Sequence, residues 1–250
     1  MTIISKRLKT FLLILSLASG IIIASGYVYY RQINRAEDPR IIDARLKMTE
    51  YNRLMADNEP DLALLLLDHV EDIYMNTPGY PESYEPGVIH NNRGSIFLIK
   101  AEKYFLENKK PDMENLAQAR KHIEKGIQIY KGWLDKVTPM EKNRVRSMVL
   151  PCFQADDPAF TGLDLEKIIE KRVDDIMVSK TETLRRLSVS YTNLGIVFRY
   201  EGNPEESGEC YKKAIELWPD NYVAKDNLNR LMGLPPEKRS IIRQIFFKKK

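Results

Sequence analysis

The sequence has few of the residues that carry catalysis or bind metals. It contains two cysteines and three histidines in 250 residues, and none of them forms a CxxC, HExxH or HxxxH spacing. The GxSxG, GxGxxG and phosphate-loop patterns are also absent. These absences argue against zinc sites, thioredoxin-like sites and the common hydrolase and nucleotide-binding sites. We therefore predict no catalytic, cofactor-binding or metal-binding residues.

The two cysteines, Cys152 and Cys210, are 58 positions apart. We expect both to be unpaired, with Cys152 in a loop and Cys210 on a helix. A disulfide between them is the alternative if this part of the chain lies outside the cytoplasm. Lys212 and Lys213 would lower the pKa of the Cys210 thiol, but no base stands beside it in the sequence.

Patterns typical of β-sheet are also scarce. Few segments alternate with period two, and most of the chain is rich in residues that propagate helices. We therefore predict an all-α fold. Residues 1–40 carry a charge of +4 and residues 234–250 carry +5, so residues 41–233 carry −5 of the net +4. Basic ends of this kind favour membrane lipid or acidic partners over nucleic acid.

One long apolar run interrupts the charged sequence. Residues 11–30, FLLILSLASGIIIASGYVYY, contain no charged side chain. A helix of about 20 residues spans the hydrocarbon core of a membrane, which is about 30 Å thick. Basic residues flank the run, and its tyrosines suit the membrane interface. We predict that residues 1–36 form an amino-terminal anchor with one transmembrane helix.

A cleaved signal peptide is the alternative, because residues 24–26 are the small residues Ala, Ser and Gly. The apolar run continues past Gly26, which favours an uncleaved anchor. The basic cluster before the run is tighter than the one after it. This favours a cytoplasmic amino terminus and an extracytoplasmic body on a single-pass protein, with a bacterial inner membrane as the expected setting.

Turn signals divide the rest of the chain. Residues 37–137 read as degenerate helical hairpins, separated by segments rich in Pro, Gly and Asn. We predict an irregular connector over residues 138–163, where Pro and Gly recur. Helical patterns return over residues 164–233. Residues 234–250 read as a basic amphipathic tail with Ile and Phe on one stripe.

The most regular pattern lies in residues 188–221. Aromatic, small and apolar residues stand there at fixed spacings, at Tyr191, Leu194, Gly195, Phe198, Ser207, Tyr211, Ala214 and Pro219. This pattern resembles the tetratricopeptide repeat, a helical hairpin of about 34 residues. The resemblance implies a solenoid of stacked hairpins. Gly195 and Ser207 would then be small because the two helices of the hairpin approach most closely there.

The turn inside this unit carries helix-stop and helix-start residues. Gly202 suits a left-handed position after a helix, and Pro204 suits the first position of the next one. We predict that Asn203 caps that helix, with Glu206 completing a capping box. Asp220 is predicted to cap a last helix over residues 220–232, which would cover the end of the array.

Earlier segments are weaker relatives of this unit. In residues 87–130, Gly94 and Ala119 take the small positions, but the interval between them is long, so both helices must be extended. In residues 44–77 the match is degenerate. A generic helical bundle is the alternative for these outer units.

The resemblance also implies a concave groove, lined by the first helix of each hairpin, that usually holds peptides or helices of other proteins. Thr192 is counted on this face. Asparagines occupy equivalent positions in three units, and an amide both donates to and accepts from a peptide backbone; family consensus is the alternative reason for them. The predicted partner-binding residues are Asn92, Asn193, Ile196, Arg199, Tyr200, Asn227 and Arg230.

Together these features predict a membrane-anchored scaffold for protein–protein interactions at a cell-envelope surface. A permanent structural or assembly subunit of a membrane protein complex is the first alternative. The second is a helical enzyme that uses the 151–163 loop, with Cys152, Asp156 or Asp157. The tail over 234–250 would contact membrane lipid, dock a protein or cap the last hairpin. We predict no cofactor and do not expect nucleic acid as a partner.

Overall fold

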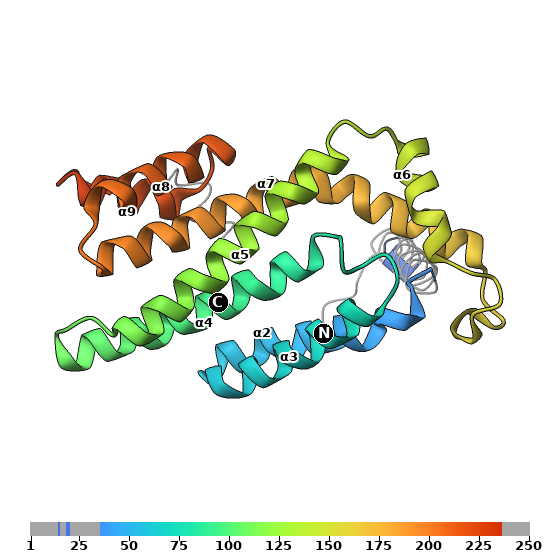
Figure 1. The fold of residues 1–250 in the computed structure, drawn as a ribbon, viewed down its shortest axis with the longest axis horizontal. Helices are drawn as coiled ribbons and strands as arrows, with labels where there is room; N and C mark the ends of the chain where they lie inside the picture. Colours follow the sequence, from blue (N-terminus) through green and yellow to red (C-terminus); the bar gives the residue numbers. More distant parts are fainter. Residues whose placement is uncertain (1–14, 16–18, 21–35, 237–250) are drawn as a thin grey trace, which may run out of the picture.

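The computed structural model describes residues 36–236 together with Leu15, Ser19 and Gly20, and the regular structure of residues 36–236 is helical (Figure 1). The predicted all-α fold is confirmed. The α-helices of this part are α2 (Ile42–Ala56), α3 (Pro60–Asn76), α4 (Glu85–Asn108), α5 (Met113–Val137), α6 (Lys142–Val149), α7 (Leu165–Tyr200), α8 (Pro204–Leu217) and α9 (Tyr222–Leu231). Three short 3-10 turns accompany them: η1 (Pro39–Ile41), η2 (Leu150–Cys152) and η3 (Pro158–Phe160).

The predicted membrane span over 11–30 and the tail beyond Pro236 lie outside the described residues, apart from the three isolated positions in the span. Within the described part of the chain, no helix combines the length and the apolar character that a membrane crossing requires.

Consecutive helices pair as hairpins. Helix α2 packs against α3, α4 against α5, and α7 against α8, while α9 packs on α8 (Figure 1). Neighbouring hairpins are joined because α3 also packs on α4 and α5 on α7. This succession of stacked hairpins is the arrangement of a helical-repeat solenoid.

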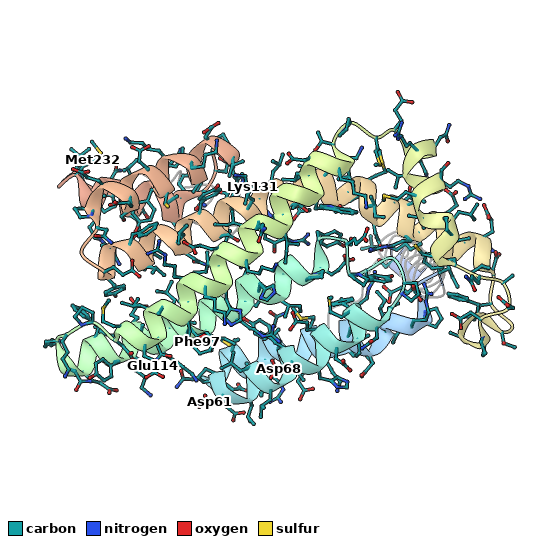
Figure 2. All side chains as sticks on the ribbon, in the orientation of Figure 1. Asp61, Asp68, Phe97, Glu114, Lys131 and Met232 are labelled. Atoms are coloured by element: carbon teal, nitrogen blue, oxygen red, sulfur yellow. The ribbon has the colours of Figure 1, made fainter. Side chains whose placement is uncertain are left out.

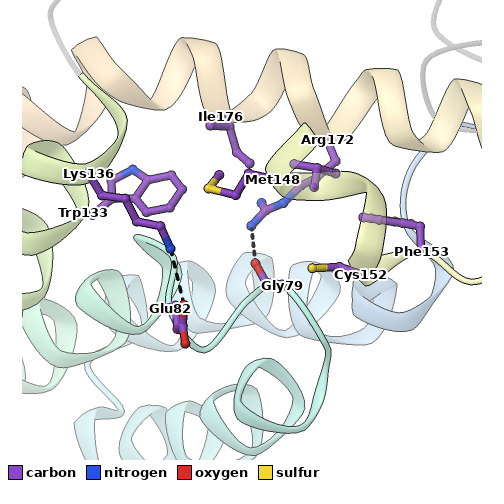
Figure 3. A pocket seen from close by; sticks show the side chains of 10 residues that line it. Gly79, Glu82, Trp133, Lys136, Met148, Cys152, Phe153, Arg172 and Ile176 are labelled. Atoms are coloured by element: carbon purple, nitrogen blue, oxygen red, sulfur yellow. Dashed lines mark hydrogen bonds and ion pairs between the residues drawn. The ribbon is translucent and has the colours of Figure 1, made fainter. Parts of the chain in front are cut away.

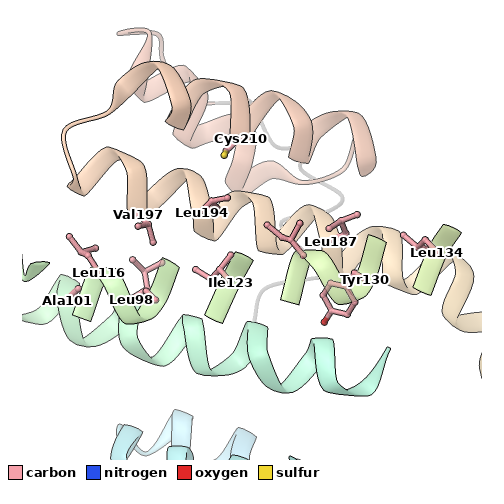
Figure 4. Close-up of a cluster of buried hydrophobic side chains, with 12 residues drawn as sticks. Leu98, Ala101, Leu116, Ile123, Tyr130, Leu134, Leu187, Leu194, Val197 and Cys210 are labelled. Atoms are coloured by element: carbon pink, nitrogen blue, oxygen red, sulfur yellow. The ribbon is translucent and has the colours of Figure 1, made fainter. Parts of the chain in front are cut away.

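The central core lies between α4, α5 and α7 (Figure 4). The extended helices expected between Gly94 and Ala119 are present, because α4 has 24 residues and α5 has 25. Each large apolar side chain buried in this way contributes about 1.5–3 kcal/mol to the free energy of unfolding. The core side chains include Leu98, Leu116, Ile123, Tyr130, Leu187, Leu194 and Val197.

Small residues mark the closest approach of paired helices, as predicted. A Cβ atom on Gly195 would lie 2.6 Å from the ring of Tyr211 and 3.1 Å from the Ser207 carbonyl oxygen. Ser207 itself is fully buried, and its hydroxyl donates to the Gly195 carbonyl at 2.7 Å. The hairpin of α7 and α8 therefore has no room for a larger residue at Gly195.

The turn between α7 and α8 differs in part from the prediction. Gly202 has a φ of +82°, and α8 begins at Pro204, as predicted. The predicted cap is wrong, because the Asn203 side chain accepts no capping hydrogen bond. Its backbone N–H donates to the Phe198 carbonyl at 2.8 Å. That N–H is therefore not available to Glu206 for a capping box, and a Schellman ending of α7 replaces it.

The start of α9 is also corrected. Asn221, and not Asp220, occupies the cap position, and its side-chain oxygen accepts from the Ala224 N–H at 3.0 Å. The Asn221 amide nitrogen donates to the hydroxyls of Ser188 at 2.8 Å and Thr192 at 2.9 Å. One buried side chain thus starts α9 and ties it to α7.

The predicted irregular connector over 138–163 contains a helix, α6, and the turns η2 and η3. Helix α6 packs on α7 through its buried residues Val145 and Val149, which are four positions apart. The connector also contributes Phe153 and Phe160 to a cluster with the first half of α7. It is therefore a packed element and more than a link between two halves.

Ion pairs join the first two hairpins at one edge of the molecule, where Figure 2 labels Asp61 and Asp68 on α3. Arg93 of α4 pairs with Asp68 at 2.6 Å and also with Glu71, and Lys100 of α4 pairs with Asp61. The pair of Lys100 and Asp61 is largely exposed, and such pairs contribute about 0–1 kcal/mol. Arg93 is buried, so its pairs with Asp68 and Glu71 hold α3 on α4 and satisfy a charge that would otherwise be buried without a partner.

Candidate partner-binding site

The first helices of the second and third hairpins, α4 and α7, are linked by a row of polar side chains. The residue numbers of the linked partners rise together along both helices, so the two helices run parallel. We call this row the polar seam. Its hydrogen bonds run from Ser190 Oγ to Asn91 Oδ1 (2.7 Å), from Asn193 Nδ2 to Ser95 Oγ (3.0 Å) and from Tyr200 Oη to Glu102 Oε1 (3.3 Å).

Four of the predicted partner-binding residues are engaged within the array. Asn193 and Tyr200 belong to the polar seam, and Arg199 Nη1 donates to Asn227 Oδ1 at 3.2 Å, which joins α7 to α9. The Asn227 side chain is buried. These side chains hold neighbouring helices together, and a partner that used their polar groups would have to replace those bonds.

The other three predicted residues have different surroundings. Ile196 packs on the central core, Asn92 is half-buried on α4, and Arg230 is exposed on α9. Thr192, counted on the same face in the sequence, is buried and accepts a hydrogen bond from Asn221. It belongs to the contact between α7 and α9, because the amide of Asn221 reaches across from the start of α9.

At the amino-terminal end of the polar seam, the structure contains a cavity of about 180 Å³ that sequence reasoning missed. Helices α2, α3, α4 and α7 all contribute to its wall. Arg186 comes from α7, one turn before Ser190, and Val88 comes from α4. Two arginines, a glutamate and apolar or aromatic side chains line it together: Arg45, Met48, Tyr84, Glu85, Val88 and Arg186 among them.

The comparison with protein families shows what kind of hairpin α7 and α8 form. The family model described as tetratricopeptide repeat matches residues 188–221, the carboxyl-terminal part of α7, all of α8 and the turn before α9. The chain contains a tetratricopeptide repeat. A search of curated proteins found no match.

The tetratricopeptide repeat indicates a scaffold for protein–protein interactions, and the family is in general a non-catalytic interaction module. The matched unit is the hairpin of α7 and α8, and the hairpins of α2 and α3 and of α4 and α5 stack before it. A single repeat cannot bury its own apolar face, so the hairpin of α4 and α5 completes its core, and the hairpin of α2 and α3 packs in turn on α4.

The 151–163 loop, proposed for the enzyme alternative, lies beside a second cavity of about 100 Å³ (Figure 3). Cys152 lines this cavity, and burial raises the pKa of its thiol. Asp157 accepts from the Ala159 N–H at 2.9 Å and so caps η3. Asp156 is exposed. The aspartates thus hold the loop or meet solvent, and a high thiol pKa is the opposite of what nucleophilic catalysis requires.

Arg172 extends from α7 toward Gly79 at this cavity, as Figure 3 shows. Its guanidinium pairs with Glu85 at 2.5 Å, donates to the Gly79 carbonyl at 3.2 Å and lies 4.0 Å from the centre of the Tyr80 ring. The Arg172 and Glu85 side chains are both buried. This pair connects the start of α4 to the first half of α7.

The cysteines are both free, as expected. The expected effect of the lysines on Cys210 is wrong, because burial raises the pKa of its thiol to about 11 and the nearby Glu124 and Glu209 act in the same direction. Cys210 packs in the central core and is a structural residue.

Two histidines that are far apart in the sequence meet between α4 and α5. The Nδ1 atoms of His90 and His122 are 3.1 Å apart and their rings stack, while Phe97 stacks on the other side of His122. Among the described residues, no three His, Cys, Asp or Glu side chains are grouped as metal ligands. Burial is the largest cause that lowers the pKa of both histidines, and that of His122 falls to about 4.

Proposed function

We propose that this chain is a membrane-anchored scaffold that holds a peptide or helix of another protein along the first helices of its hairpins. The observation that carries the proposal is the tetratricopeptide repeat over 188–221 stacked on two further hairpins. The charge-free run over 11–30 supports the anchor. The weaker basic cluster after that run supports a body outside the cytoplasm.

Site-specific photocrosslinking in the full-length chain tests the partner-binding face. A photoreactive residue in place of Asn92 or Arg230 samples the proposed face without breaking the polar seam. Gln128 on α5 and Lys212 on α8 are exposed on second helices and serve as matched controls. We expect the same partner to be crosslinked from Asn92 on α4 and from Arg230 on α9, and from neither control. Equal crosslinking at all four positions would contradict the proposal.

The permanent-subunit alternative is separated by the lifetime of the complex. A transient partner is crosslinked in the cell but lost during detergent purification, whereas a structural subunit co-purifies in a fixed ratio. Protease protection of each terminus in intact cells and spheroplasts tests the proposed topology. Mass spectrometry of the mature amino terminus tests whether the run over 11–30 is retained.

A further inference from the structure

The wall of the cavity at the amino-terminal end of the polar seam contains one arginine without a paired carboxylate in the part of the chain that the structure describes. Arg45 is paired with Glu37 at 2.5 Å and with Asp175 at 3.0 Å. Glu85 is paired with Arg172. Arg186 has no carboxylate within 4 Å among residues 36–236. Arg45 and Glu85 of the wall are thus held in ion pairs, whereas Arg186 has none among the described residues.

The Arg186 guanidinium also has unused hydrogen-bonding capacity. Its Nη1 atom is buried and has no hydrogen-bond partner within the described part of the chain. The guanidinium lies 4.9 Å from the centre of the Tyr84 ring, which holds it in place on one side. A buried donor without a partner is destabilising, because it has given up its hydrogen bonds to water. An acceptor on a ligand would remove that cost.

The rest of the wall is apolar or neutral. Met48 of α2 and Val88 and Ile89 of α4 supply aliphatic surface. Burial raises the pKa of Tyr74 to about 12 and that of Tyr84 further, so both phenols stay protonated. The volume of about 180 Å³ exceeds the cavity of about 150 Å³ that accepts benzene in another protein. A ring-sized apolar group therefore fits beside Arg186.

We propose that this cavity binds a carboxylate carried on an apolar group of about the size of a benzene ring, with Arg186 as the counter-ion. The carboxylate belongs either to a partner peptide or to a free small acid. In the first case the inference deepens the proposed function, because the cavity opens at the end of the polar seam and would anchor one residue of the bound peptide.

The probe for the test is 3-phenylpropionate, with the neutral 3-phenylpropanamide as its isosteric control. Binding is measured by saturation-transfer NMR on the full-length protein in lipid nanodiscs, with empty nanodiscs subtracted. We expect the acid to bind about tenfold or more tightly than the amide, because a hydrogen bond to a charged group is worth more than a neutral one. Equal binding of acid and amide, or no binding of either, would overturn the proposal.

Two variants and one control test whether the probes bind in this cavity. Arg186→Gln should remove the preference for the acid, whereas Arg185→Gln should keep it, because Arg185 is exposed and paired with Glu182. Met48→Trp fills the cavity from α2 and should abolish binding of both probes while leaving Arg186 intact. Circular dichroism confirms that each variant is folded. Wild-type preference in both Arg186→Gln and Met48→Trp would refute the assignment.

A second pair of probes separates the two sources of the carboxylate. N-acetylphenylalanine mimics the end of a peptide chain and should bind more tightly than 3-phenylpropionate if the ligand is a peptide. The reverse order indicates a free small acid. If Arg186→Gln loses the preference for the acid but keeps the crosslinks from Asn92 and Arg230, the partner binds without using the cavity. If the probes bind but no crosslink forms at either position, the cavity binds a carboxylate and the scaffold function is refuted.

Discussion

At the scale of single residues, stability is decided by how closely two helices approach. The Tyr211 ring occupies the space beside Gly195, while Gly132 on α5 has no neighbouring atom within 4 Å of a built Cβ. The same substitution therefore has opposite consequences at the two glycines.

Replacing Gly195 by Ala should lower the free energy of unfolding by about 1–3 kcal/mol, because the new methyl group overpacks the hairpin. Gly132→Ala should raise it by about 0.5–1 kcal/mol, because alanine loses less chain entropy on entering a helix. Urea denaturation of the two variants measures both changes. A stabilised Gly195→Ala variant would contradict the close approach.

The histidine pair gives the fold a dependence on acid. In the unfolded chain His122 titrates near pH 6.5, and in the folded protein its pKa is about 4. Between these values the unfolded state binds more protons, so the free energy of unfolding falls as the pH falls from about 6.5 to about 4. Above about pH 6.5 His122 is neutral in both states, and this loss of stability is absent.

His122→Asn should therefore make stability less dependent on pH in this window than it is in the wild type. The measurement is the urea midpoint from pH 7 to pH 4. Parallel slopes for wild type and His122→Asn would show that the pair does not control acid stability.

At the scale of the secondary-structure elements, the hydrogen bonds at the start of a helix determine how firmly it is held on its neighbours. Asn221 accepts from the Ala224 N–H and donates to two hydroxyls of α7, whereas Asn203 occupies a cap position without a side-chain capping bond. An asparagine therefore contributes much more to stability at the start of α9 than at the start of α8.

Asn221→Ala should lower the free energy of unfolding by about 1–3 kcal/mol, since it removes a cap and two buried hydrogen bonds. It should also release α9, which hydrogen exchange of its backbone amides detects as faster exchange from Ala224 onward. Asn203→Ala should change stability much less. Equal losses in the two variants would argue against the Asn221 network.

Element patterns could be predicted where burial repeats along one helix. On α5 the buried residues from Leu116 to Tyr130 recur every three or four positions, which is the spacing that indicates a helix with one buried face. Helix α6 was missed because it has only eight residues and prolines stand on both sides of it. Asp220 was predicted as a cap because the rule for caps is local. Asn221 is preferred because its amide also reaches α7, which no local rule contains.

The candidate site was harder to predict than the fold. Asn193 and Arg199 lie on the first helix of a hairpin, α7, and Asn227 lies on α9, but the repeat spacing did not indicate that neighbouring helices bind their side chains. Arg186 and Arg45 are far apart in the sequence, and only the stacking of α2 beside α4 and α7 brings them to one cavity. His90 and His122 meet because α4 packs against α5 in one hairpin.

At the scale of the whole molecule, one buried ion pair joins the first half of α7 to the segment that enters α4. Arg172 and Glu85 are both buried, and Arg172 also holds Gly79, Ser83 and the face of Tyr80. Taking charges out of water is costly, so the pair is stable only while both members are present.

Arg172→Met should lower the free energy of unfolding by about 3–5 kcal/mol, because it leaves Glu85 buried without a counter-charge. The double variant Arg172→Met/Glu85→Gln should recover part of this loss. Arg53→Met, at an exposed arginine that pairs within α2, should be nearly neutral. Denaturant unfolding of the three variants checks the order. A double variant less stable than Arg172→Met alone would contradict the account.

Helix α7 has 36 residues without an interruption. At about 1.5 Å per residue it is a rod about 54 Å long. Its first half is clamped by α6 and by Arg172, and its last turns are the first helix of the tetratricopeptide repeat. A helix without a hinge transmits rotation along its whole length. A tilt of α7 at the Arg172 end therefore also tilts the repeat. Because Arg172 is paired with Glu85, the orientation of the repeat is coupled to the start of α4.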